Sequence, residues 1–242
     1  AVSSIELGMD TLTLKRFAAF SDDEVVEHLH VQDSERVFCV YEALKRGVSH
    51  QTIWDITKID WWFLDKLQHL ADLETALAAC GGSLSEAQYR EAKKYGFQDK
   101  TILRLTGAKA LPLENCRAGF KMVDTCAAEF SASTPYFYST YDGDNEAAAF
   151  IAQKEAAQGK KKKVLVLGSG PIRIGQGIEF DYCSVHCVWT LKAHGCEAII
   201  VNNNPETVST DFDTGDRLYF DPLTPESVDN VIATEKPDAC VV

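Results

Sequence analysis

The chain has 242 residues, of which 45% are hydrophobic and 25% are charged, values typical of one large or two ordinary globular domains. Its formal net charge of −12 disfavours binding to nucleic acid, because such binding depends on clustered Lys and Arg. The one basic run, Lys160 to Lys163, is interpreted as solvating a linker, and no apolar run approaches the roughly 18 residues of a membrane span. We therefore expect neither a nucleic-acid nor a membrane partner.

Up to about residue 120, apolar residues recur at helical spacing, which predicts an all-helical first domain. The expected helices span residues 11–20, 22–30, 34–46, 50–58, 61–79, 84–94 and 99–106. Two segments have the spacing of capping boxes, Ser21 to Glu24 and Ser83 to Glu86. Four glycines are expected where helices stop, namely Gly47, Gly81, Gly96 and Gly107. The helix over 61–79 is expected to bury Trp62, Leu64, Leu67, Leu70, Leu73 and Leu77.

Short helices joined by tight turns also describe a helix-turn-helix DNA-binding domain. The recognition helix of such a domain carries exposed basic and amide side chains, whereas residues 49–58 and 83–95 mix acidic with basic residues and favour a solvated face. Trp61, Trp62 and Phe63 cannot all face inward, because neighbours on a helix lie about 100° apart. At least one of these aromatic residues is expected to pack against another helix of the bundle or against a partner.

Beyond residue 120 the pattern changes twice. Residues 123–141 form an extended segment rich in Thr, Tyr and Phe, and residues 142–162 are interpreted as a linker or an exposed helix. Strands at 163–167, 197–201, 217–220 and 238–242 then alternate with helices at 177–194 and 225–235, which predicts a parallel sheet with right-handed crossovers. The expected fold class is α + α/β, with a helical domain over 1–141, a linker over 142–162 and an incomplete Rossmann-like subdomain over 163–242. Because the last residues form an apolar strand, we expect the chain to be a fragment of a longer polypeptide.

The junction after the strand at 163–167 is rich in glycine. It contains Gly168, Gly170, Pro171, Gly175 and Gly177, and it precedes a helix whose first N–H groups would point at the turn. The spacing matches neither standard phosphate-binding loop. The next strand ends at Asn202, where a nicotinamide-binding Rossmann unit has an acidic residue, which argues against that alternative.

Eight cysteines are scattered through apolar patterns, so we expect reduced thiols in the cytoplasm or in an organelle stroma. Cys183, His186 and Cys187 share one side of a helix and could begin a metal site. No second ligand pair accompanies them. Core packing of these side chains is favoured, and no metal site is expected.

Two longer strings carry a family resemblance. They read Gly-x-Gly-Pro-x-x-Ile-Gly-Gln-Gly-x-Glu-Phe-Asp-Tyr-Cys from Gly168 to Cys183, and Asn-x-Asn-Pro-Glu-Thr-Val-Ser-Thr-Asp from Asn202 to Asp211. Together they closely resemble the opening of the second, carbamate-phosphorylating half of carbamoyl phosphate synthase large chains. Residues 123–130 and 138–141 resemble the segment that leads into that half, and residues 57–64 resemble the preceding oligomerisation domain. Ile172 departs from the family, because many members carry a polar residue at that position.

The resemblance implies an enzyme that joins bicarbonate, ammonia taken from glutamine and two ATP into carbamoyl phosphate. It implies ATP with Mg²⁺ or Mn²⁺ and K⁺ for the full-length enzyme, bound in an ATP-grasp domain that lies outside this chain. No cofactor is expected to bind this chain tightly, and the chain alone is expected to be inactive. The implied partners are the small glutaminase subunit and further copies of the chain, associated through the helical domain.

The resemblance also implies a conduit that shields carbamate from water, with Gly177, Glu179 and Glu206 along its wall. We expect burial in the complete conduit to let both carboxyl groups be neutral and share a proton with the intermediate. Alternatively, Glu179 is a first-turn carboxylate of a helix and Glu206 a turn residue. Arg173 could contact an anion or cap carbonyl groups, and Asn202, Asn204 and Asp211 are expected to order loops through side-chain hydrogen bonds.

Overall fold

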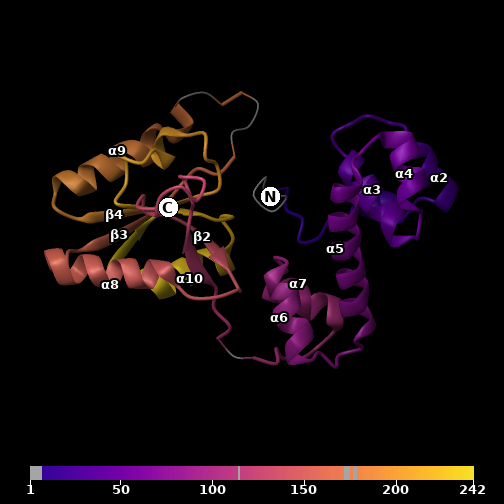
Figure 1. Cartoon of the computed structure of the whole chain (residues 1–242), viewed down its shortest axis with the longest axis horizontal. Helices are drawn as coiled ribbons and strands as arrows, with labels where there is room; N and C mark the ends of the chain where they lie inside the picture. The colour runs from indigo at the N-terminus through magenta and orange to yellow at the C-terminus, as the bar shows by residue number, and fades with distance from the viewer. Residues whose placement is uncertain (1–6, 114, 172–174, 177–178) are drawn as a thin grey trace. The chain divides into compact units, whose positions relative to one another are not determined.

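The computed structural model describes residues 7–113, 115–171, 175–176 and 179–242, with Phe180 described by its backbone only. The chain divides into two compact units, Met9–Glu114 and a second that contains Asn115–Val242. Figure 1 shows the first unit in indigo to purple and the second in pink to yellow. Each unit has its own buried core.

The first unit is helical, as predicted. Its helices are α1 (Lys15–Ala18), α2 (Asp22–His28), α3 (Arg36–Lys45), α4 (His50–Thr57), α5 (Trp61–Ala79), α6 (Glu86–Lys94) and α7 (Asp99–Thr106). Helix α5 is the longest and packs against α3 and α7. The four glycines predicted at helix ends all have positive φ angles, and Gly107 is the left-handed C-cap of α7.

One predicted capping box is confirmed and the other is wrong. Ser21 caps α2 and exchanges hydrogen bonds with Glu24. At α6 the capping serine is Ser85, whose Oγ accepts from the Gln88 N–H at 3.3 Å while the Gln88 side chain accepts from the Ser85 N–H at 3.1 Å. The helix begins at Glu86, so Glu86 is its first residue and cannot be the third residue that a capping box requires.

The burial predicted for α5 is confirmed in part. Leu64 and Leu77 are buried, and Leu67, Leu70 and Leu73 are half-buried. The prediction for Trp62 is wrong, since its side chain is 59% exposed. Leu64 occupies the inward position of the first turn, and the 100° step between neighbours turns the three aromatic residues before it outward.

The second unit is a six-stranded sheet between helices. Its elements are β1 (Gly119–Met122), β2 (Tyr136–Thr140), α8 (Glu146–Gln158), β3 (Lys163–Leu167), α9 (Glu179–Ala193), β4 (Glu197–Asn202), the 3-10 turn η2 (Val208–Thr210), β5 (Arg217–Phe220), α10 (Pro225–Glu235) and β6 (Ala239–Val241). The strand order is β1-β2-β5-β4-β3-β6. Strands β1 and β2 pair antiparallel, and the other neighbouring pairs in this order are parallel.

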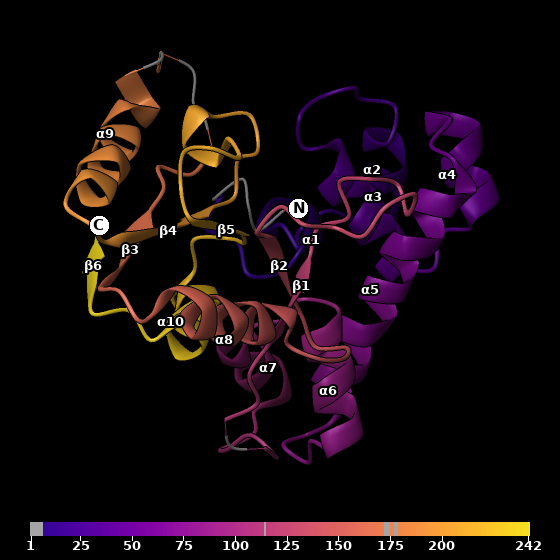
Figure 2. The same cartoon turned by 60° about the vertical axis from the view of Figure 1, so that its left-hand side comes forward.

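Apolar side chains on alternate positions of the strands form two cores. On one face, residues of β3, β4 and β5 pack with Ala147 of α8 and Val231 of α10. On the other face, Val188 of α9 packs on Val166, Ile200 and their neighbours. Both views show this layering, with α9 on one side of the sheet and α8 and α10 on the other (Figures 1 and 2).

The structure differs from the sequence prediction between residues 115 and 163. The predicted boundary lies at residue 141, whereas the structural division falls before Asn115, because β1 and β2 extend the sheet beside β5. The segment interpreted as a linker or an exposed helix contains the helix α8, which buries Ala147 and Ile151. Lys163 does not solvate a linker: its side chain is buried, and its Nζ lies 2.7 Å from Glu155 Oε1.

Ion pairs fill the edge of the sheet where the parallel strands begin. Arg217, which is 1% exposed, donates from Nε to Glu235 at 2.7 Å and from a terminal nitrogen to Glu197 at 3.0 Å. Burial opposes the charge of Arg217, but the hydrogen bonds to Glu235 and Glu197 outweigh it and raise the arginine pKa. Paired charges therefore fill the edge where the parallel strands begin. Ligands of such sheets bind at the opposite edge, where the strands end.

Candidate functional site at the carboxyl edge of the sheet

The glycine turn and the loop after β4 meet at the carboxyl edge of the sheet. The Gly168 N–H donates to the Val201 carbonyl at 2.8 Å, which continues the pairing of β3 with β4. A β-carbon at residue 168 would lie 2.5 Å from Asn202 Cγ. Gly168 is therefore required because the buried Asn202 side chain occupies the space beside it.

Asn202 also begins a buried polar cluster. Its side-chain oxygen accepts from the Asn203 N–H at 2.9 Å, and its Nδ2 lies 3.5 Å from the hydroxyl oxygens of Thr207 and Ser209. Thr210 donates to the Thr207 carbonyl at 2.6 Å. These contacts close the loop after β4 upon itself and hold it next to the glycine turn.

Asp181, which the sequence analysis did not single out, joins this loop to the first turn of α9. Its Oδ2 accepts from the Ser209 N–H at 2.6 Å, and its Oδ1 is buried without a hydrogen-bond partner among the described residues. The sequence offered one signal for Asp181, because a carboxylate in the first turn of a helix is stabilised by the helix N-terminus. Its partner lies 28 positions away, and a single sequence does not reveal such a pairing.

The two predicted conduit carboxylates lie on these joined elements. Glu179 is the first residue of α9, and Glu206 lies in the loop after β4; both side chains are exposed. The Glu206 N–H donates to Asn204 Oδ1 at 3.0 Å, so Glu206 also belongs to a side-chain-capped turn. Gly177 and Arg173 lie outside the described residues.

The other predicted loop residues have distinct surroundings. Gly170 has a φ of 77°, which glycine adopts without strain, and the half-buried Pro171 follows it. Gly175 is exposed. Asp211 has an exposed side chain and contributes to the loop through its backbone, whose N–H donates to Val208 and whose carbonyl accepts from Thr214.

A further carboxyl group lies at the carboxyl end of β5. Asp221 is 4% exposed, and its Oδ1 accepts from the Ser139 hydroxyl at 2.5 Å. Its Oδ2 is buried without a partner in the described part of the chain. Burial raises the pKa of Asp221 to about 6, against which the hydrogen bonds from Ser139 act only in part.

Other predicted features of the chain can be compared with the structure. Cys183 and His186 are exposed on α9, so core packing is the wrong expectation for them, whereas Cys187 is half-buried. Within the described ranges, no cluster of three His, Cys, Asp or Glu residues could hold a metal ion. Among the helices that the structure describes, none has the length and apolar character to cross a membrane.

The structure argues against two alternatives, DNA binding by the helical unit and nicotinamide binding by the sheet unit. Lys93, on the helix weighed as a DNA reader, is buried and lies 2.9 Å from Asp99, so it is not part of an exposed basic face. Strand β4 ends at Asn202, and Asn203 begins the loop after it. A nicotinamide-binding unit has an acidic residue at the end of this strand, so the asparagine there argues against that alternative.

Comparison with known proteins assigns both units to one family. Residues 1–121 match the family model described as carbamoyl-phosphate synthetase large chain, oligomerisation domain, and residues 160–242 match the carbamoyl phosphate synthase preATP-grasp domain. The chain is 49% identical over 248 aligned residues to the carbamoyl phosphate synthase large chain of Agathobacter rectalis and 48% identical over 249 to that of Lachnoclostridium phytofermentans. Each alignment covers 100% of this chain and 22% of the relative. The chain therefore belongs to the family of carbamoyl phosphate synthase large chains.

Proposed function

We propose that this chain supplies the self-association domain and part of a carbamate conduit wall to a glutamine-dependent carbamoyl phosphate synthase. The main support is the match of its two units to two domains of that large chain. Because the chain spans 22% of the relatives' length, the ATP-consuming chemistry is assigned to the remainder of such a protein. ATP, Mg²⁺ or Mn²⁺ and K⁺ then bind outside these residues.

The conduit role is assigned to Gly177, Glu179 and Glu206. Carbamate hydrolyses in water, so it needs a path that excludes solvent. The contact of Asp181 with Ser209 fixes the first turn of α9 against the loop after β4, and these two elements carry the two carboxylates. Both side chains are exposed in this chain, which leaves them free to face a wall completed by another part of the synthase.

The proposed partners are a small glutaminase subunit, which supplies ammonia, and further copies of the large chain. Self-association is supported by the match to the oligomerisation domain and by the exposure of Trp61, Trp62 and Phe63. We place the protein in the cytoplasm or an organelle stroma, because its eight cysteines are all free thiols.

The test of the conduit uses the full-length synthase that contains this segment. In that enzyme, Glu179→Ala and Glu206→Ala should raise the ratio of ATP hydrolysed to carbamoyl phosphate formed, because carbamate escapes into water before its phosphorylation. Asp213→Ala removes an exposed carboxylate from the next stretch of loop and serves as the matched control. An unchanged ratio in both Glu variants would show that these carboxylates do not line the path.

A second assay tests whether the catalytic chemistry lies outside this chain. The isolated chain, supplied with ATP, bicarbonate and ammonia, should form no carbamoyl phosphate above background, whereas the full-length enzyme should form it. Sustained turnover by the isolated chain would contradict the assignment of the chemistry to other domains.

A purely structural oligomerisation module is the alternative, favoured by the exposed aromatic residues at the start of α5. It also predicts a mass above one protomer in light scattering. Unlike the conduit proposal, it predicts that Glu179→Ala and Glu206→Ala leave the ATP ratio unchanged in the full-length synthase.

A further inference from the structure

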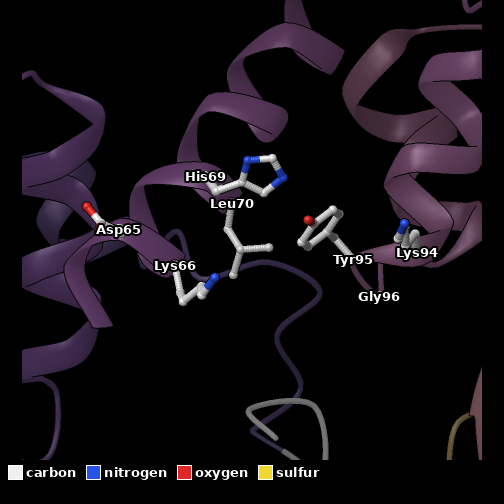
Figure 3. A pocket seen from close by; sticks show the side chains of 7 residues that line it. All are labelled: Asp65, Lys66, His69, Leu70, Lys94, Tyr95 and Gly96. Carbon is white, nitrogen blue, oxygen red and sulfur yellow. The ribbon is translucent and has the colours of Figure 1, made fainter. Parts of the chain in front are cut away.

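A groove lies between α5 and the end of α6 in the helical unit. Its volume is about 600 Å³. It is lined on one side by Asp65, Lys66, His69 and Leu70, and on the other by Lys94, Tyr95 and Gly96. The rings of His69 and Tyr95 lie 4.3 Å apart between centroids. Figure 3 shows His69 and Leu70 reaching from α5 toward Tyr95. The groove thus combines Leu70, the packed rings of His69 and Tyr95, two lysines and the carboxylate of Asp65.

The groove is continuous with one exposed face of α5. Trp62, Asp65, Lys66 and His69 occur at positions i, i+3, i+4 and i+7, which lie on one side of a helix. The opposite side carries the buried Leu64 and Ala71. Lys66 Nζ lies 5.4 Å from the centre of the Trp62 ring, and the Phe63 ring packs edge-on against Trp62 at 5.0 Å. The exposed indole of Trp62 therefore lies on the same helix face as the groove and within two helical turns of it.

We propose that this face of α5 is a two-fold interface with a second copy of the chain, in which two α5 helices cross antiparallel and Trp62 of each copy enters the groove of the other. The inference deepens the self-association proposed above and rests on it. A two-fold interface must be self-complementary, so the projecting group and its receptor must belong to the same surface. Here α5 carries both Trp62 and one side of the groove.

The charges on α5 fit the same symmetry. If the axis passes between Asp65 and Lys66, then Asp65 faces Lys66 of the partner subunit and Lys66 faces Asp65 of the partner subunit. The same axis places Trp62 opposite His69 of the partner subunit, at the wall of the groove. Both residues at the axis are exposed. In one copy Asp65 Oδ1 lies 3.3 Å from His50 Nδ1, which holds the carboxylate near the start of the helix.

The charge pattern favours a second copy over a partner of different sequence. A purely acidic partner would be repelled by Asp65, and a purely basic one by Lys66, whereas an identical helix running antiparallel satisfies both. A central aromatic anchor in a fitted pocket is also the usual source of binding energy in such interfaces.

Charge reversal tests the proposed axis. Asp65→Lys alone and Lys66→Asp alone should each weaken association at least ~10-fold, because each places like charges at the axis twice. The double variant Asp65→Lys with Lys66→Asp should regain most of the affinity, since the same two pairs form with their signs exchanged. The measurement is sedimentation equilibrium of the chain over a dilution series, with helicity followed by circular dichroism.

The anchor is tested separately. Trp62→Ala should weaken association at least ~10-fold, as expected for a hot-spot aromatic residue. Trp189→Ala is the matched control. Trp189 is likewise exposed and packs against a neighbouring ring, that of His186, but it lies on α9 in the other unit. The control should leave the affinity unchanged.

The outcomes separate this proposal from the one on which it rests. A wild-type chain that is monomeric at every concentration contradicts self-association itself. A wild-type oligomer that Trp62→Ala does not weaken overturns the α5 interface but leaves self-association in place. Failure of the double charge variant to recover, with its helicity intact, shows that the surface does not face a second α5.

Discussion

The side chain of Asp221 makes the stability of the sheet unit depend on pH. Its pKa in the folded protein is about 6 against an ordinary value of 3.8, because it is buried. A raised carboxyl pKa favours folding below about pH 4, and this contribution is lost as the pH rises toward 6, where the folded protein must also ionise the group. Asp221→Asn should therefore raise the free energy of unfolding at pH 7.5 by up to about 3 kcal/mol and change it little at pH 4.

The comparison needs the difference between variant and wild type at each pH, measured by denaturant unfolding, because other groups titrate as well. Asp213→Asn removes an exposed carboxylate from the same unit and should give a difference near zero throughout. A gain from Asp221→Asn that was equal at pH 4 and pH 7.5 would show that the effect does not come from ionisation.

The space beside Gly168 is too small for a larger residue at that position. Gly168→Ala would place a β-carbon 2.5 Å from Asn202 Cγ, so it should lower the free energy of unfolding by about 1–3 kcal/mol. Gly119→Ala is the control, because its added carbon would lie 3.4 Å from the carbonyl oxygen of Asp144, an ordinary contact distance. Adding Asn202→Gly to Gly168→Ala should cost less than the sum of the two single changes, since the clash disappears; strict additivity in denaturant unfolding would contradict the contact.

At the scale of elements, structure set by local signals was predictable from the sequence. The bounds of α5, α7 and α10 agree with the predicted residues, because local signals mark their ends. Asp60 caps the start of α5, Gly107 ends α7, and Thr224 caps the start of α10. Strands β1 and β2 are short and gain their structure from pairing with each other and with β5. Helix α8 is rich in alanine and has little contrast between its faces, so the sequence left open whether this segment is a linker or an exposed helix.

The same distinction applies to the candidate site. The glycine string and the Asn-rich string both follow buried strands along the chain, and both lie at the carboxyl edge of the sheet. The contact of Asp181 with Ser209 spans 28 positions, and that of Ser139 with Asp221 spans 82. Such pairs depend on strand order, which one sequence does not fix.

The serine that caps the N-terminus of α6 should stabilise the helical unit. Ser85→Ala should lower the free energy of unfolding of the helical unit by about 1 kcal/mol, because it removes the acceptor for the Gln88 N–H. Ser83→Ala, two residues earlier, is the matched control, and its expected effect is a few tenths of a kcal/mol or less. Thermal unfolding of both variants decides between the two serines, and an equal loss in both would contradict the cap assigned to Ser85.

At the scale of the whole molecule, the two units should be able to unfold separately, because each has its own buried core. Leu64 is fully buried in the helical unit, and Ile199 is fully buried in the sheet unit. Leu64→Ala and Ile199→Ala should each cost their own unit about 2–5 kcal/mol. Hydrogen exchange followed by mass spectrometry reads protection in each unit of the intact chain.

Leu64→Ala should reduce protection of the slowest amides within 9–114 and leave those of β3 and β4 unchanged, and Ile199→Ala should do the reverse. Each variant thus serves as the control for the other. If either substitution lowered protection in both units by the same amount, the chain would be one cooperative unit. The helical unit could then not associate through α5 without also altering the stability of the carboxyl edge of the sheet, where the proposed conduit residues Glu179 and Glu206 lie.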